Sequence, residues 1–372
     1  KVGWLASVAG MAVVCAMTVY GIFYAVKAKE KLGDFHEAKA QAKAEARADR
    51  ERNATETTPL QSPCASPTYR GCGLGPFDPV VQEVLGLPGL ALWAFSVNIS
   101  QVGTAIAYIT VILKSAESLG AAHAHAFCAL GILLMVLSTV KRLQGIAYFS
   151  CIGLLVYSFV LLGLIWESGQ RVADGRFGAS VHAVSLEASA HDIIGWFGIV
   201  AFAFGGLPVS LSIYEEMSKP EDFFKVTSIA FGICWAIYAS VGALGYACYG
   251  NSTDTIIFFN FAPGSVFRVG SVTTVSVILI LTYVIQMVPV YNFAQSVVGD
   301  YVHWLAIRLV IVAFTMVVAH FIPSTVTLIS ITGAFASAMS CFVLPPLVYI
   351  SMKPAPPWHE IATCICLIIL GC

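Results

Sequence analysis

Residues 193–217 read IIGWFGIVAFAFGGLPVSLSIYEEM, an apolar run of membrane-spanning length that two glycines and a proline interrupt at its centre. Gly205 and Gly206 each lower helix propensity by about 1 kcal/mol relative to alanine, and Pro208 lacks an N–H and clashes with the preceding turn. The sequence therefore predicts a helix that breaks between Phe204 and Pro208. Backbone groups freed in mid-membrane are tolerated only where they face protein, water or a ligand, so the break is a candidate binding cavity.

The two half-helices that such a break creates present opposite partial charges to a ligand. The N-terminal end of one half-helix favours an anion, and the C-terminal end of the other favours a cation. A zwitterionic amino acid carries both charges, and it therefore suits the break. The alternative is a proline kink that packs against a neighbouring helix and binds nothing.

The rest of the chain has the composition of a membrane protein. Hydrophobic residues make up 58% of its 372 residues and charged residues 11%, whereas about a quarter of a soluble globular chain is charged. We expect an all-α integral membrane protein with a single transmembrane domain over 1–372 and about ten spans, since a span needs about 20 apolar residues. The ten apolar runs cover about 2–26, 89–113, 121–140, 145–166, 193–214, 227–249, 269–298, 304–322, 325–350 and 359–371, the last cut off by the end of the chain.

A long polar segment, 27–88, separates the first two runs. Its first half is rich in alanine, lysine and glutamate and predicts a charged, exposed helix, whereas 53–79 is rich in Ser, Thr, Pro and Gly and predicts a loop. With alternating spans, fifteen of the 20 lysines and arginines fall on the side of this segment and five on the other. The positive-inside rule therefore makes 27–88 a cytoplasmic loop. Acidic residues are interleaved with the basic ones, which argues against nucleic-acid binding.

Signatures of enzymes, channels and metal sites are missing from the sequence. It contains no serine elbow, no Gly-rich phosphate loop and no HExxH, so we expect neither a catalytic residue nor a cofactor. Cys364 and Cys366 lie in an apolar run without a second ligand pair, which argues against a metal site. Arg308 and His320 lie close to span ends, where they can reach the interface, and the sequence shows no carboxylate relay across the bilayer. No charge ring or selectivity loop indicates a channel.

Six stretches occur in a fixed order along the chain. They are QVGTAIAYI (101–109), KRLQGIAYFS (141–150), FAFGGLPVSLSIYEEMSKPEDF (202–223), GYACYG (245–250), LTYVIQMVP (281–289) and ISITGAFASAMSCFVLPPLVYI (329–350). Together they resemble the amino acid/auxin permease family of the amino acid-polyamine-organocation superfamily. In order, they are similar to its third span, the turn between its fourth and fifth, its broken sixth span with the following turn, and its seventh, eighth and tenth spans. The family has eleven spans, so the ten found here would be its second to eleventh, and the first would be missing.

The resemblance implies a LeuT-like fold of two inverted five-helix repeats, in which the broken first and sixth spans line the substrate site. The substrate-binding residues that it assigns to the sixth, third and eighth spans are Phe202, Ala203, Phe204, Gly205 and Gly206; Gln101, Thr104 and Tyr108; and Thr282, Tyr283 and Gln286. For each polar member the alternative is an interhelical hydrogen bond of about 1 kcal/mol. Pro208 and Glu216 are implied to act in gating, the glutamate through a Tyr-x-Glu pattern that begins at Tyr214; Glu216 could equally be an exposed helix-end residue.

Secondary active transport of amino acids by alternating access is the function that the resemblance implies. Sodium-coupled members carry hydroxyl residues shortly before the eighth-span proline, where this chain has Ile285 and Met287, so we expect proton coupling or simple exchange rather than sodium coupling. His191, at the outer entrance to the broken span, is a candidate protonation site, with an incidental interfacial histidine as the alternative.

Other functions stay open at this point. The chain could be a sodium-coupled or auxin-type carrier, or a non-transporting amino acid sensor or scaffold that signals through 27–88. Radiolabelled substrate separates these classes, because a sensor would bind an amino acid without accumulating it in vesicles. The excess of positive charge on one side suits a plasma membrane and a vacuolar or lysosomal membrane equally.

Overall fold

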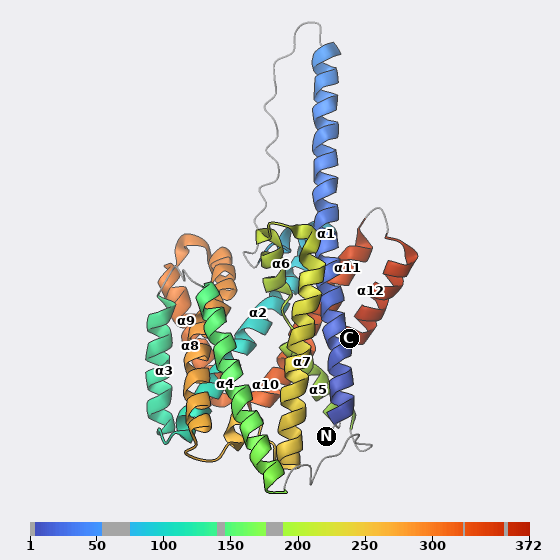
Figure 1. The fold of residues 1–372 in the computed structure, drawn as a ribbon. Coiled ribbons are helices and arrows are strands. Elements are labelled where there is room, and N and C mark those ends of the chain that lie inside the picture. Colours follow the sequence, from blue (N-terminus) through green and yellow to red (C-terminus); the bar gives the residue numbers. More distant parts are fainter. Residues whose placement is uncertain (1–3, 54–74, 140–145, 176–188, 323, 353–355) are drawn as a thin grey trace.

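A computed structural model of the chain describes residues 4–53, 75–139, 146–175, 189–322, 324–352 and 356–372, and within these ranges the structure is helical and has no strand. The α-helices are α1 Trp4–Asn53, α2 Asp78–Ser118, α3 His123–Ser138, α4 Ile146–Ala173, α5 Ala190–Ala203, α6 Leu207–Glu216, α7 Phe223–Tyr249, α8 Val266–Val298, α9 Trp304–Phe321, α10 Thr325–Thr332, α11 Leu344–Ser351 and α12 Trp358–Gly371. Two π-helical segments, η5 Gly333–Ser337 and η6 Met339–Val343, join α10 to α11. Figure 1 shows these helices as one bundle from which the second half of α1 projects.

Seven stretches of the described residues are long and apolar enough to cross a membrane. They are 5–34, 78–118, 190–216, 220–249, 266–298, 304–321 and 325–351, and α3 and α12 are shorter apolar helices. The prediction of an all-helical integral membrane architecture is therefore confirmed. The number of spans stays a prediction.

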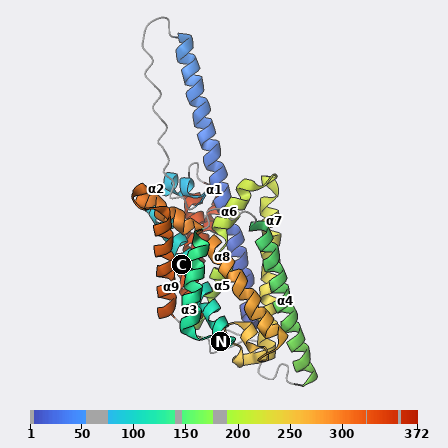
Figure 2. The same ribbon diagram turned by 90° about the vertical axis from the view of Figure 1, so that its left-hand side faces the viewer.

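Apolar side chains form two main buried clusters that meet along α2. The first cluster joins α1, the beginning of α2, α5, α6, α11 and α12, and includes Trp93, Phe204 and Phe342. The second joins the end of α2 with α3, α8 and α9, and includes Leu134 and Met287. Figure 2 shows α3 and α9 on one side of the bundle and α4 and α7 on the other. Because α2 contributes to both clusters, it connects the two halves of the bundle.

The structure differs from a simple loop at both ends of 27–88. The helix α1 continues without interruption from the first apolar run to Asn53, as the charged first half predicted. At the other end, α2 begins at Asp78 and buries Val80 and Val81, whose spacing from Phe77 places all three on one helical face. Residues 54–74 lie outside the described ranges.

A break near the start of α2 sets the direction of the following span. Gly86 has φ +69°, a left-handed conformation that glycine adopts without steric cost, and Pro88 follows. The short helical turn before the break is held by Trp93, whose Nε1 donates to Asp78 Oδ1 over 2.9 Å. The Phe77 and Trp93 rings also meet edge to face, so the turn is packed against the span that it precedes.

Candidate functional site

The helix break predicted at 204–208 is present in the structure. Helix α5 ends at Ala203 and α6 begins at Leu207. Between them, Gly205 N donates to Phe202 O over 3.1 Å and Gly206 N donates to Phe204 O over 2.8 Å, which closes the chain into tight turns. Pro208 lies in the first turn of α6, where its missing N–H removes no helical hydrogen bond. The C-terminal carbonyls of α5 and the N-terminal amides of α6 thus converge on the three intervening residues.

Close packing against the η5 segment explains why glycine occupies position 205. A Cβ atom there would lie 3.0 Å from Ser337 Oγ and 3.3 Å from the carbonyl oxygens of Ala201 and Phe202. Any larger side chain must therefore displace its surroundings. Gly206 is less constrained, since the nearest atom to a Cβ there, a ring carbon of Phe231, is 3.5 Å away.

Close packing continues about two turns before Gly205, at Gly198 of α5. A Cβ on Gly198 would lie 2.1 Å from the carbonyl oxygen of Ser330, and a Cβ on Gly333 would lie 1.8 Å from that of Gly198. Backbones approach this closely only where at least one of the two facing residues has no side chain. A Cβ on Gly103 of α2 would similarly meet Thr332 Oγ1 at 2.4 Å. The end of α10 is therefore held tightly between α2 and α5.

The residues of the break differ in their exposure. Ala203 and Gly205 are exposed, Phe202 and Gly206 are partly buried, and Phe204 is buried. The Phe204 ring packs against Tyr238 of α7, with ring centroids 5.6 Å apart. Phe204 therefore anchors the broken helix to α7, and the exposed surface at the break is contributed by small residues.

The predicted residues of α2 and α8 lie in different environments. Gln286 Nε2 donates to Gln101 Oε1, which joins the two helices through a pair of partly buried amides. Thr104 and Thr282 instead donate to backbone carbonyls four residues earlier in their own helices. Tyr108 is partly buried and packs against the second apolar cluster. Gln101 and Gln286 thus form the interhelical hydrogen bond that the sequence offered as the alternative to substrate binding. Their role in substrate binding stays a prediction.

Tyr283 is part of the core. Its side chain is fully buried in the second apolar cluster, and its hydroxyl lies 2.7 Å from Thr315 Oγ1 of α9. This contact was not visible in the sequence, because Thr315 lies in a separate apolar run without any marking motif. In the described state Tyr283 pairs α8 with α9.

The far end of α6 is clamped to α1 by two adjacent contacts. Lys29 Nζ forms an ion pair with Glu215, and Tyr214 donates its hydroxyl hydrogen to Glu30 Oε1 over 2.6 Å. The sequence had pointed to Glu216, which is exposed, whereas the ion pair is made by the residue before it. The Tyr-x-Glu pattern thus lies at the end of α6 that contacts α1, and the gating role of Glu216 stays a prediction.

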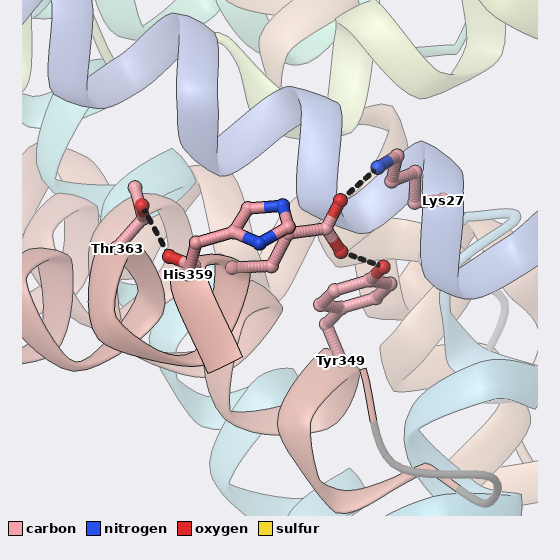
Figure 3. A network of polar contacts seen from close by, with 5 residues as sticks. Lys27, Tyr349, His359 and Thr363 are labelled. Carbon is pink, nitrogen blue, oxygen red and sulfur yellow. Dashed lines mark hydrogen bonds and ion pairs between the residues drawn. The ribbon is translucent and has the colours of Figure 1, made fainter. Parts of the chain in front are cut away.

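A second polar cluster joins α1, α11 and α12, and no motif in the sequence indicates it. Glu360 of α12 accepts from Lys27 Nζ at 2.6 Å and from the Tyr349 hydroxyl at 2.5 Å, as Figure 3 shows. The same lysine nitrogen lies 4.6 Å from the centre of the Phe23 ring, a favourable cation–π distance. Nearby, Thr363 Oγ1 donates to the backbone oxygen of His359. This cluster fixes α12 to α1.

His191 lies in the first turn of α5 and is exposed. The helix begins with a capping box, in which the Ser189 hydroxyl accepts from Asp192 N and the Asp192 carboxylate accepts from Ser189 N. This cap fixes the start of α5. The predicted proton-binding role of His191 stays a prediction.

Comparison with known proteins decides the family. The model of the family described as "Transmembrane amino acid transporter protein" matches residues 1–372. The chain belongs to this family of transporters. Among its relatives in Arabidopsis thaliana, amino acid transporter AVT1B is 27% identical over 248 residues, which are 64% of this chain and 44% of that protein. Amino acid transporter AVT3C is 29% identical over 177 residues, or 47% of this chain and 40% of that protein.

Membership in the transporter family confirms two predictions from the sequence. The resemblance to amino acid permeases is correct, and the family is one of membrane transporters rather than enzymes. The transporter chain described here spans about half the length of the curated relatives that it matches.

Proposed function

We propose that this chain carries out secondary active transport of amino acids by alternating access, within a LeuT-like fold. The observation that carries the proposal is the break between α5 and α6, at which opposite helix ends meet beside exposed Ala203 and Gly205. The amides at the start of α6 suit the carboxylate of an amino acid, and the carbonyls at the end of α5 suit its ammonium group. The names of the relatives support the same substrate class.

The arrangement of apolar clusters supports alternating access. The cluster of α1, α5, α6, α11 and α12 and the cluster of α3, α8 and α9 are separately packed and share α2. Two packed bodies that meet along a common helix can rock against each other without disturbing either core.

Proton coupling is the form of transport that we propose. Met287 is fully buried and Ile285 partly buried, and neither side chain offers an oxygen to a sodium ion. His191 is exposed in the first turn of the broken helix, and an imidazole ring can take up and release a proton. We propose that it takes up the coupled proton from the non-cytoplasmic side, at either the plasma membrane or a vacuolar or lysosomal membrane.

Uptake into proteoliposomes tests the proposal. The full-length protein is supplied with a mixture of labelled amino acids under an imposed proton gradient, under a sodium gradient and under no gradient. A proton-coupled carrier accumulates label only under the first condition, and His191→Gln lowers that accumulation. Stimulation by sodium would exclude proton coupling, and binding without any uptake would replace the carrier by an amino acid sensor of the same fold.

A further inference from the structure

The connection between α10 and α11 has an unusual helical form. Residues 333–337 and 339–343 are π-helical, so the chain contains more residues per turn than an α-helix. Such turns are rare, and they are found mostly at functional sites, where they place side chains out of the α-helical register. Here they contact both α2 and α5 beside the break. The π-helical form therefore sets which side chains of this segment face the break.

Ser337, at the end of the first π-helical segment, carries an unpaired hydroxyl. Its side chain is 1% exposed, and within the described ranges its Oγ has no hydrogen-bond partner. Buried hydroxyls are almost always paired, so each exception calls for an explanation. Ser340, three residues further on, is also buried, but its hydroxyl donates to the backbone oxygen of Ser337. The two buried serines thus lie in adjacent π-helical segments, and of their hydroxyls that of Ser340 is hydrogen-bonded and that of Ser337 is not.

The unpaired hydroxyl faces the broken helix. Ser337 Oγ lies 3.0 Å from the place that a Cβ of Gly205 would take, and the carbonyl oxygen of Ala201 lies 3.3 Å from the same place. At this end of α5 the described amides donate to the oxygens of Val200 and Phe202, which leaves the Ala201 oxygen between them without a backbone donor. An unpaired donor and an acceptor without a backbone donor therefore both lie close to Gly205.

We propose that Ser337 is a positioning residue of the transport cycle, whose hydroxyl donates to the Ala201 carbonyl in the amino acid-bound state and releases it in the state described here. This inference rests on the proposed function, because it assumes that an amino acid binds at the break. Ligand binding would draw the end of α5 toward the π-helical segment, and the new hydrogen bond would stabilise that arrangement. An unpaired group in one state and a paired group in the other bias the equilibrium toward the paired state.

Hydrogen–deuterium exchange of the full-length protein tests this inference. The parent, Ser337→Ala and the matched control Ser340→Ala are compared with and without a mixture of the standard amino acids. We expect the mixture to slow amide exchange across 201–210 in the parent and in Ser340→Ala, and the slowing to fall at least threefold in Ser337→Ala. Without ligand, Ser337→Ala should unfold at the parent's temperature or higher, because the hydroxyl makes no bond in that state.

Equal protection in Ser337→Ala and the parent overturns the inference, and so does a parent that amino acids do not protect. A lower unfolding temperature of Ser337→Ala without ligand also overturns it, since the hydroxyl would then already be bonded. The proposed function fails by a different result. If amino acids protect the parent but proteoliposomes take up no label, the carrier is excluded, while the role of Ser337 in the ligand-bound state is retained.

Discussion

Replacing Gly333 by alanine is the sharpest test of how the break is supported. The added Cβ would lie 1.8 Å from the carbonyl oxygen of Gly198, whereas Cβ atoms in real structures essentially never approach within 3.0 Å of another heavy atom. It would also lie 2.8 Å from Phe202 Cβ, so it cannot escape sideways. Helix α5 and the start of the η5 segment must therefore separate by about 1 Å at a place where small residues let the two backbones pack closely.

The loss of stability in Gly333→Ala depends on which atoms clash. Overpacking a well-packed interior costs about 1–3 kcal/mol, and we expect Gly333→Ala to reach about 3 kcal/mol because the opposing atom is backbone rather than a flexible side chain. The measurement is the apparent melting temperature of the purified full-length protein in detergent, which we expect to fall by several degrees. Gly198→Ala should lose comparable stability, since its Cβ would lie 2.1 Å from the oxygen of Ser330.

A matched control separates this clash from a general effect of removing glycine. A Cβ on Gly232 of α7 would meet no atom within 4 Å. Alanine in a helix is favoured over glycine by about 1 kcal/mol, so Gly232→Ala should melt at the parent's temperature or above it. If Gly333→Ala is as stable as Gly232→Ala, α5 and η5 do not pack as closely as described, and the predicted clash is wrong.

Two further predictions concern contacts that hold the helices around the site. Glu215→Lys should slow transport, because it places two positive charges at the contact of α6 with α1. The charge swap Lys29→Glu/Glu215→Lys should restore the transport rate. Because the ion pair is partly exposed, Glu215→Lys should change the free energy of unfolding by about 1 kcal/mol. A transport rate that stays low in the charge-swap variant would contradict a role of the Lys29–Glu215 ion pair. Tyr283→Phe should leave amino acid affinity unchanged and lower the melting temperature, because it removes the hydrogen bond between the two buried hydroxyls of α8 and α9, while Thr315 keeps its bond to Val312 O. Weaker amino acid binding at an unchanged melting temperature would instead indicate that Tyr283 contributes to the substrate site.

The helix break can be predicted from the sequence because it depends on residues that are close together in the chain. Two glycines and a proline within four residues disrupt a helix in any environment, and the structure has the interruption at 204–206. The second clear prediction was the helical membrane architecture, which follows from long uncharged runs. Both depend on residues close together in the chain.

Contacts between segments that are far apart in the chain could not be predicted from the sequence. Nothing near Gly333 indicates that Gly198 will lie against it, because glycine is common in membrane helices for several reasons. The π-helical register that turns Ser337 toward Gly205 has no recognised sequence signal. The choice of Glu215 over its neighbour likewise depends on how α6 is rotated against α1. These features require three-dimensional packing, and they are the ones that complete the candidate site.

Amino acid binding at the helix break can be measured by comparing two leucine substitutions with the parent. Equilibrium binding of a labelled amino acid mixture is measured on the full-length protein, on Gly205→Leu and on Gly232→Leu. Leucine at 205 must fill the space between Ser337 and the end of α5, whereas leucine at 232 extends into open space. The account predicts that Gly205→Leu loses binding while Gly232→Leu keeps the affinity of the parent. Parental affinity in a folded Gly205→Leu protein would contradict it.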